Sequence, residues 1–253
     1  MTFSANLGFL WTELALPAAI EKAAAAGFDA VEFHYPYAQN RAAVKAALAA
    51  TQLPVMGLNT ERGEAGQNGL AALPGRQAEA RALIDQAFDW AADLGARNVH
   101  VMAGFASGDA ARQQFIANLN YAADVGERAG VGVLIEPLNA FDAPNYFLNR
   151  IDQALAILAE VDRANVRLMF DCYHVARTEG DILAQFDHAR ARIGHVQFAG
   201  APDRGAPDLG AVDYAPVFAH IAASGWDQPL GAEYKPGGDT DQSLGWLASL
   251  GTA

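Results

Sequence analysis

The chain has 253 residues, of which 52% are hydrophobic and 18% charged, a balance typical of a folded globular protein and not of a disordered one. Its 17 Lys and Arg residues against 29 Asp and Glu residues give a formal charge of −12, which disfavours a nucleic-acid partner because phosphate backbones are bound by clustered cations. A small-molecule partner fits better. This length suits one α/β barrel, and no linker or low-complexity tract divides the chain, so we expect a single domain over residues 1–253.

The cysteine content and the N-terminus bear on location. Cys172 is the only cysteine, which excludes an intrachain disulfide and favours a reducing compartment. Residues 1–6 lack the basic region and apolar core of a secretory signal, and no apolar run approaches the roughly 20 residues needed to span a bilayer. We therefore expect a cytoplasmic protein with no membrane partner. A homo-oligomer is left open.

Short apolar runs alternate along the chain with Ala-rich stretches that close on glycine. The first such stretch starts near Pro17, ends at Gly27 and is followed at once by the run Ala30–Phe33. Eight strand-then-helix units predict an α/β fold, a single (β/α)₈ barrel. An open doubly wound sheet is less favoured because no G-x-G-x-x-G motif follows any run. The predicted helices lie near residues 16–26, 41–50, 75–94, 110–129, 149–160, 179–190, 213–223 and 240–250.

Two long glycine-containing segments interrupt this alternation. Asn59–Pro74 follows the third predicted strand, and Gly200–Asp213 follows the seventh. Irregular segments of this length usually carry function or act as lids. Both belong to the C-terminal face of the predicted barrel, where the active sites of this fold are built.

Four later strands end on oxygen-bearing side chains. The buried-type run Val133–Ile135 stops at Glu136, and the following proline cannot donate to a strand ladder. The next three runs close in the same way on Asp171, Gln197 and Glu233. Each one alone could be a solvated polar group at the rim, but four on consecutive strands indicate a site.

An all-oxygen donor set is preferred by hard cations such as Mg²⁺ or Mn²⁺, whereas Zn²⁺ prefers His and Cys. Three crowded carboxylates would also repel one another unless a cation intervened. We therefore predict a divalent metal held by Glu136, Asp171, Gln197 and Glu233.

Cationic groups follow the same strand ends. His174, Arg204 and Lys235 are either counter-charges for the carboxylates or contacts for a substrate that carries a carboxylate or several hydroxyls. Asp142 is a candidate for orienting a substrate hydroxyl or for holding its loop. Asn59 is a weaker candidate for substrate binding, because a structural hydrogen bond explains it equally well.

Eight stretches together form a recognisable pattern. They are Phe3–Leu7, Val31–Tyr37, Leu73–Arg76, Ile135–Asn139, Asp171–His174, Gly194–Gln197, Asp203–Gly205 and Glu233–Pro236. In this order they resemble the hydroxypyruvate isomerase family, within the xylose-isomerase-like barrels. They run from the first predicted strand to the last, so the resemblance covers nearly the whole chain. Some members of the family act on 2-oxo-tetronates, which are four-carbon acids.

The resemblance implies aldose–ketose isomerisation of a small hydroxy-oxo acid through an enediolate. It makes Glu136 and Glu233 the proton-transferring pair, with Asp171 and Gln197 completing the metal site. It also implies that His174 and Arg204 contact the substrate. The segment Thr60–Gly69 departs from the pattern of many relatives, which leaves three- and four-carbon substrates open.

Other activities remain to be compared with this one. A ketose 3-epimerase acting on a neutral sugar would use the same residues, and a non-catalytic sugar-acid binding barrel would keep the pocket without needing both glutamates. An apurinic endonuclease on the same barrel is disfavoured. Its three-zinc site would need several more His ligands, whereas few of the 6 histidines here stand at strand ends, and a charge of −12 does not suggest a basic groove for DNA.

Overall fold

A computed structural model describes residues 1–250 of the chain. Eight parallel strands pair in chain order as a closed barrel, which confirms the predicted (β/α)₈ fold. The strands are β1 (Phe3–Asn6), β2 (Ala30–Glu32), β3 (Val55–Asn59), β4 (Asn98–His100), β5 (Gly132–Ile135), β6 (Val166–Asp171), β7 (Ile193–Phe198) and β8 (Leu230–Ala232).

Helices follow the strands in the order expected. They are α1 (Leu16–Ala25), α2 (Arg41–Thr51), α3 (Gln77–Leu94), α4 (Gly108–Ala129), α5 (Ile151–Val161), α6 (Cys172–Thr178), α7 (Ile182–Ala189), α8 (Tyr214–Ala223) and α9 (Gly245–Leu250), with short 3₁₀ turns at Pro36–Ala38, Arg190–Arg192 and Asp241–Ser243. None of the described helices is both long and apolar enough to cross a membrane.

Capping residues explain where several helices start and stop. Asn40 accepts a hydrogen bond from Ala43 N at 3.2 Å at the start of α2. Gly95 and Gly130 end α3 and α4 in the left-handed conformation, as the glycine spacing predicted.

The helix predicted near 179–190 corresponds to α7, which the structure bounds at Ile182–Ala189. The helix before it, α6, was not predicted. It begins directly after β6 because Asp171 Oδ1 accepts a hydrogen bond from Tyr173 N and so caps it, and the chain turns at Gly180 before α7 begins. The last helix starts later than predicted, at Gly245 instead of residue 240, because a 3₁₀ turn comes first.

Two compact units make up the chain. Unit 1 comprises residues 1–56, 171–187 and 196–253, and unit 2 comprises residues 57–170 and 188–195. The prediction of a single domain over residues 1–253 stays a prediction. Each unit is described below by itself.

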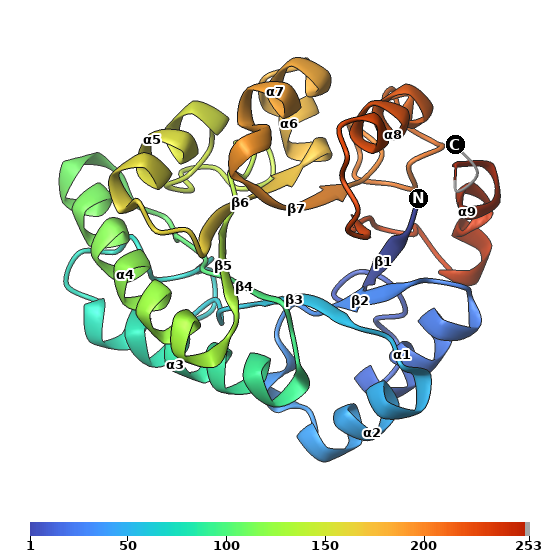
Figure 1. Cartoon of the computed structure of the whole chain (residues 1–253), viewed down its shortest axis with the longest axis horizontal. Coiled ribbons are helices and arrows are strands. Elements are labelled where there is room, and N and C mark those ends of the chain that lie inside the picture. Colours follow the sequence, from blue (N-terminus) through green and yellow to red (C-terminus); the bar gives the residue numbers. More distant parts are fainter. Residues whose placement is uncertain (251–253) are drawn as a thin grey trace. The chain divides into compact units, whose positions relative to one another are not determined.

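Unit 1 joins the beginning of the chain to its end. In β1, Phe3 packs edge-on against Trp246 of α9 with ring centroids 5.1 Å apart, and both side chains are buried. In the same aromatic cluster, the ring centroids of Phe198 in β7 and Phe218 in α8 lie 4.9 Å apart. Figure 1 shows β1 and α9, in dark blue and dark red, beside each other. This cluster anchors the strands that carry the polar side chains of unit 1.

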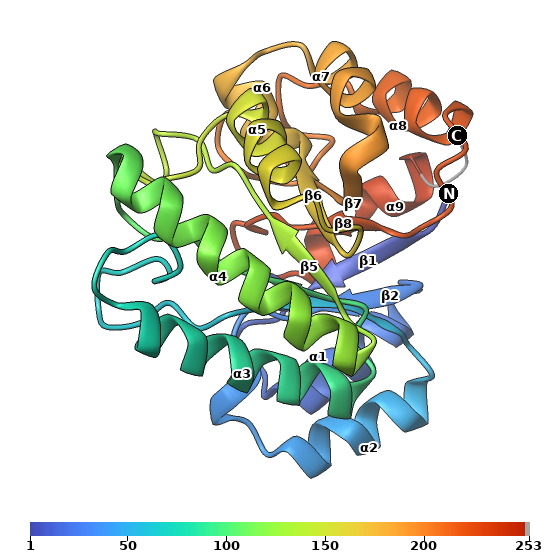
Figure 2. The same ribbon diagram turned by 60° about the vertical axis from the view of Figure 1, so that its left-hand side comes forward.

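Unit 2 is built on the longest helices. The helices α3 and α4 lie side by side in Figure 1 and again in the turned view of Figure 2. Phe88 of α3 and Phe115 of α4 are almost fully buried, as are Val133 and Ile135 of β5. An uninterrupted apolar β5 is what a strand covered on both faces requires, so Glu136 stands directly after a rigid strand.

Candidate active site

The carboxylate of Glu233 follows β8 and is the centre of a buried polar cluster in unit 1. Its Oε1 lies 2.8 Å from His34 Nε2 and accepts a hydrogen bond of 3.0 Å from Asn6 Nδ2. Its Oε2 accepts a hydrogen bond from Arg204 Nη2. Only 6% of Glu233 is exposed, so this negative charge is neutralised by the protein and not by water.

Arg204 links Glu233 to a second buried carboxylate, that of Asp171. Its Nη2 lies 3.6 Å from Asp171 Oδ2. The guanidinium is also placed over the rings of Phe9 and Tyr173, 4.8 and 5.1 Å from their centroids. These contacts favour the interpretation of Arg204 as a counter-charge, while its role toward a substrate stays a prediction.

Asp171 uses its two oxygens differently. Oδ1 accepts a 2.8 Å hydrogen bond from Tyr173 N, whereas Oδ2 is buried and accepts no hydrogen bond from any residue in the range 1–250. Oδ2 lies 3.6 Å from His174 Nε2, a position in which His174 could serve as a counter-charge. His174 is the third residue of α6, a helix that the sequence did not predict.

The environment separates the pKa values of the two carboxylates. Burial, reinforced by the neighbouring Glu233 charge and opposed by Arg204, raises the pKa of Asp171 to about 7. Burial also acts to raise the pKa of Glu233, but Arg204 and His34 outweigh it and hold that pKa at about 2. Relative to ordinary carboxylates, this environment thus favours the ionised form of Glu233 and the protonated form of Asp171.

Gln197, another predicted metal ligand, lies within β7 and not after it. Its Nε2 donates a 2.8 Å hydrogen bond to Glu32 Oε2, and its Oε1 is buried with no hydrogen-bond partner in the described chain. Asn6 Nδ2 lies 3.4 Å from Glu32 Oε2 as well as 3.0 Å from Glu233 Oε1. A continuous set of polar contacts thus joins Gln197, Glu32, Asn6, Glu233, Arg204, Asp171 and His174.

Some members of this set were missed in the sequence. Glu32 ends β2, just as Asp171 ends β6, so the rule of carboxylates at strand ends would have identified it. Asn6, which ends β1, and His34, which pairs with Glu233, were also missed. Neither is a carboxylate, so the rule of carboxylates at strand ends would not have identified them.

Lys235 follows β8 but is exposed, in contrast to the other predicted residues of unit 1. Its backbone N donates a 2.7 Å hydrogen bond to Arg204 O, so the two loops that carry these cations are joined.

In unit 2, Glu136 is 5% exposed, and its Oε2 lies 3.5 Å from His100 Nδ1. Asn59 is the register partner of His100 across β3 and β4. Asp142 is exposed and accepts a 3.1 Å hydrogen bond from Asn139 Nδ2, which favours its role in holding the loop. The convergence of Glu136 with the predicted ligands of unit 1 stays a prediction.

The segment after β3 is irregular, as predicted, and its second half is attached to the residues that follow β4. Ala71 N and Ala72 N donate to Met102 O and Ala103 O at 3.2 and 2.7 Å. The buried Asn118 of α4 adds a 2.8 Å hydrogen bond to Ala71 O. These contacts hold the second half of the segment, and residues 61–68 form its tip.

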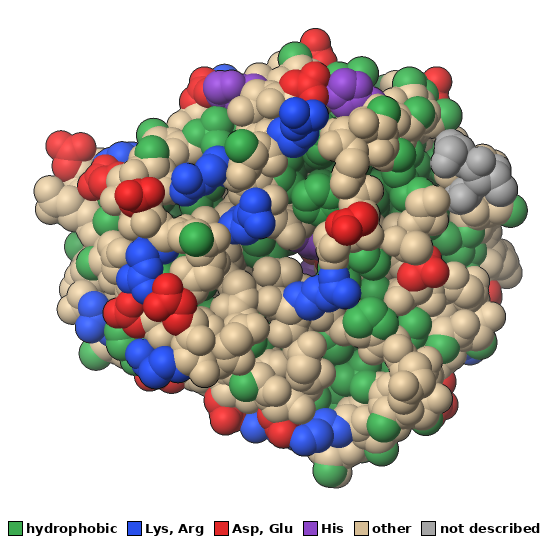
Figure 3. All heavy atoms as spheres, in the orientation of Figure 1, with side chains coloured by type: hydrophobic (Ala, Val, Ile, Leu, Met, Phe, Trp, Pro, Cys, Tyr) green, Lys and Arg blue, Asp and Glu red, His purple; other side chains and the backbone are tan. Residues whose placement is uncertain are grey.

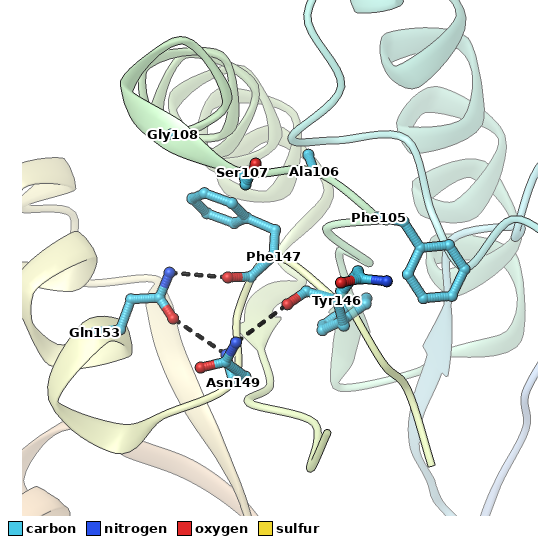
Figure 4. Close-up of a pocket in the computed structure, with 9 residues that line it drawn as sticks. Phe105, Ala106, Ser107, Gly108, Tyr146, Phe147, Asn149 and Gln153 are labelled. Atoms are coloured by element: carbon cyan, nitrogen blue, oxygen red, sulfur yellow. Dashed lines mark hydrogen bonds between the residues drawn. The ribbon is translucent and has the colours of Figure 1, made fainter. Parts of the chain in front are cut away.

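A pocket of about 570 Å³ lies in unit 2 between the segments that precede α4 and α5. Figure 4 shows Gln153 bridging Phe147 O and Asn149 N, at 2.8 and 3.1 Å, on one side, with Phe105 on the other. The residues lining it include no carboxylate, histidine, lysine or arginine. It therefore lacks the carboxylates and histidines that most often transfer protons in enzymes.

A closed parallel barrel with buried carboxylates at the ends of its strands is an architecture typical of enzymes. The family model for the xylose isomerase-like TIM barrel matches residues 20–250, and the chain belongs to that family. The chain is 43% identical to the 2-oxo-tetronate isomerase of Cupriavidus necator over 97% of its length and 96% of that protein. It is 34% identical to the hydroxypyruvate isomerase of Escherichia coli, over 98% of both chains. It is thus an isomerase by class.

A solved structure described as an AP endonuclease of family 2 from Brucella melitensis is also similar. It superposes with a TM-score of 0.94 and 35% identity over 98% of both chains. The name of that structure differs in class from those of the curated relatives.

Proposed function

We propose that the chain interconverts the aldose and ketose forms of a small hydroxy-oxo acid, either hydroxypyruvate with tartronate semialdehyde or a 2-oxo-tetronate. The full-length similarity to enzymes named for these two substrates supports the substrate class. The single observation that carries the chemistry is the buried cluster around Glu233, in which a carboxylate and two orphaned oxygen atoms share one strand-end network.

The residues present fit a divalent cation. Asp171 Oδ2 and Gln197 Oε1 are buried oxygen atoms without a hydrogen-bond partner among residues 1–250, and such atoms are costly unless a ligand meets them. Glu136, Asp171 and His174 are buried residues of the types that hold metals. We propose that Glu136, Asp171, Gln197 and Glu233 hold Mg²⁺ or Mn²⁺. A bound cation would supply Lewis-acid polarisation of substrate oxygens.

Proton transfer is assigned to the two glutamates in this proposal. One carboxylate removes the proton from the carbon that bears the hydroxyl group, and an enediolate spans the two carbons. A proton is then returned to the neighbouring carbon, and the proton of the original hydroxyl group passes to the former carbonyl oxygen, so that the carbonyl and the hydroxyl exchange places. Arg204 and His34 keep Glu233 ionised and so able to accept a proton, and general acid–base catalysis of this kind contributes about 10²–10⁴-fold.

Arg204, Lys235 and His174 are proposed to bind the acid end of the substrate, and the tip of the segment after β3 to limit its length. His174 is buried and Lys235 is exposed. In this proposal the contact of the substrate with His174 is shielded from water, whereas its contact with Lys235 is open to solvent. Asn59 and Asp142 are assigned to substrate binding as well, with Asp142 acting through the position of its loop.

An endonuclease activity, suggested by the name of the Brucella structure, is less well supported. Of the 6 histidines, His188 and His220 lie on helices with Asp152 and Asp187 as partners. On the face seen in Figure 3, acidic side chains stand among the Lys and Arg side chains. Both features disfavour a zinc cluster acting on DNA.

The test is an assay of purified protein on hydroxypyruvate, a 2-oxo-tetronate and neutral ketoses in deuterated water, before and after treatment with chelator. We expect turnover of an acid, deuterium at the carbon next to the carbonyl, and loss of activity on chelation that Mn²⁺ restores. Preferred turnover of a neutral ketose would overturn the substrate class. Undiminished activity after chelation would overturn the metal site.

A further inference from the structure

The orientation of the Gln197 amide follows from its partner. A side-chain amide has a donor end and an acceptor end, and which end faces a given neighbour is settled by hydrogen bonding. Glu32 Oε2 lies 2.8 Å from one end, and because a carboxylate accepts, that end must be the NH₂ group. The carbonyl Oε1 of Gln197 is therefore turned away from Glu32, and it is the atom left without a hydrogen-bond partner in the described chain.

Glu32 is itself held firmly in place. Ser4 Oγ donates a hydrogen bond to its Oε1, and Asn6 Nδ2 lies 3.4 Å from its Oε2. The three side chains are buried, with exposed fractions of 0 to 3%. Strands β1 and β7 thus supply donors that converge on one carboxylate of β2, which leaves Glu32 little freedom to turn or to give up its acceptor role.

Strand β8, which pairs with β1 and with β7, leaves room for the contact between Glu32 and Gln197. Gly231 of β8 is the register partner of Ser4 on one side and of Gln197 on the other. A Cβ at Gly231 would lie 2.4 Å from Glu32 Oε1 and 2.7 Å from Gln197 Cγ. A side chain at position 231 would therefore push Glu32 and Gln197 apart, and the missing side chain is a condition for their pairing.

We propose that Glu32 is a positioning residue, which fixes the amide of Gln197 so that its carbonyl oxygen is presented to a divalent cation. The inference rests on the metal site of the proposed function and deepens it. Glu32 touches neither the cation nor the substrate in this role. Through Asn6, which reaches both Glu32 and Glu233, the same carboxylate also helps to orient the side chain of Glu233.

The test is a double-mutant cycle in the full-length protein, read as Mn²⁺ affinity by calorimetry. Glu32→Gln keeps the shape but offers either end of an amide, so Gln197 loses its fixed orientation. Outer-shell partners of metal ligands are worth about 10- to 100-fold in affinity, and we expect a loss in that range. In a Gln197→Glu background both ends of residue 197 are oxygens, so Glu32→Gln should cause no further loss. An equal loss in both backgrounds, or none in either, would overturn the proposal.

A matched control and a metal-free readout separate the two proposals. Asp29 directly precedes β2, the strand that carries Glu32, and accepts a 2.9 Å hydrogen bond from Phe3 N. Asp29→Asn therefore removes a charge near Glu32 without affecting the contact with Gln197, and it should leave Mn²⁺ affinity unchanged. Melting curves check that each variant is folded.

If the wild-type protein binds no Mn²⁺, the proposed metal site is overturned. The positioning of the Gln197 amide by Glu32 can still be tested by NMR. The Gln197 side-chain NH₂ signal, identified by its disappearance in Gln197→Glu, should be protected from exchange in the wild type and lose protection in Glu32→Gln. Equal exchange in both would overturn the role of Glu32 independently of any metal.

Discussion

His34 Nε2 lies 2.8 Å from Glu233 Oε1, so a histidine from the segment after β2 is paired with the carboxylate that follows β8. This contact lowers the pKa of Glu233 against the effect of burial. Because a base must be ionised to accept a proton, His34 widens the pH range over which Glu233 can act.

Replacing His34 should therefore move the acid limb of the pH–rate profile. In His34→Ala we expect that limb to shift to higher pH and kcat/KM to fall by about 10- to 150-fold, the equivalent of one hydrogen bond to a charged group. His34→Gln, which retains a donor, should recover part of the loss. A reduced rate with an unmoved profile would indicate that His34 only supports the fold.

The two glutamates should be equally necessary. Glu136→Gln and Glu233→Gln keep the side-chain shape while removing the base, and turnover should fall by at least about two orders of magnitude in each. Unfolding curves serve as the control, since neither change should prevent folding. Near-normal turnover in either variant would mean that a single base is sufficient.

The cations near β8 should determine the preference for acids. Lys235→Ala should lower kcat/KM for an acid by about 10- to 150-fold while sparing a neutral sugar, because only the acid loses a charge-assisted contact. Arg204→Ala also leaves Glu233 and Asp171 without their guanidinium partner, so kcat/KM should fall for the acid and for the neutral sugar alike. Arg204→Lys should recover part of this loss. An unchanged acid-to-neutral ratio in both alanine variants would favour a neutral ketose isomerase or epimerase.

Asp171 should make the metal-free protein less stable at higher pH. Its pKa is raised from 3.8 to about 7 in the folded state, so between these values the folded chain holds a proton that the unfolded chain has released. The free energy of unfolding contributed by this group therefore falls as pH rises from about 4 to about 7. Urea unfolding at pH 5 and pH 8 should show the fall in the wild type and a smaller one in Asp171→Asn. Parallel behaviour of the two proteins would contradict the assignment.

The tip of the segment after β3 should affect substrate length and not chemistry. Shortening within residues 63–68 leaves the attachment of Ala71 and Ala72 to the β4 side intact. We expect a changed ratio of kcat/KM between three- and four-carbon acids, with deuterium exchange retained. A uniform loss on both acids would show that the tip serves folding or catalysis instead.

The sequence predicted the barrel because buried strands and glycine-terminated helices leave strong local patterns. It predicted Asp171 and Glu233 for the same reason, since each follows an apolar run. It did not predict α6, because the Asp171 side chain was interpreted only as a ligand and not as a helix cap. Nor could it show that Arg204 turns toward two carboxylates, because that depends on contacts between residues far apart in the chain.

The two carboxylate oxygens of Asp171 have different roles, and this affects how an aspartate at this position is interpreted in similar chains. With no residue between β6 and α6, Oδ1 starts the helix while Oδ2 is left to the site. A chain that had lost its chemistry would still need a capping residue at this position, and aspartate would serve as well as Asn, Ser or Thr. An aspartate at position 171 is therefore weak evidence of activity. The pairing of a glutamine at 197 with a glutamate at 32 and a glycine at 231, which no helix requires, is the more informative sign.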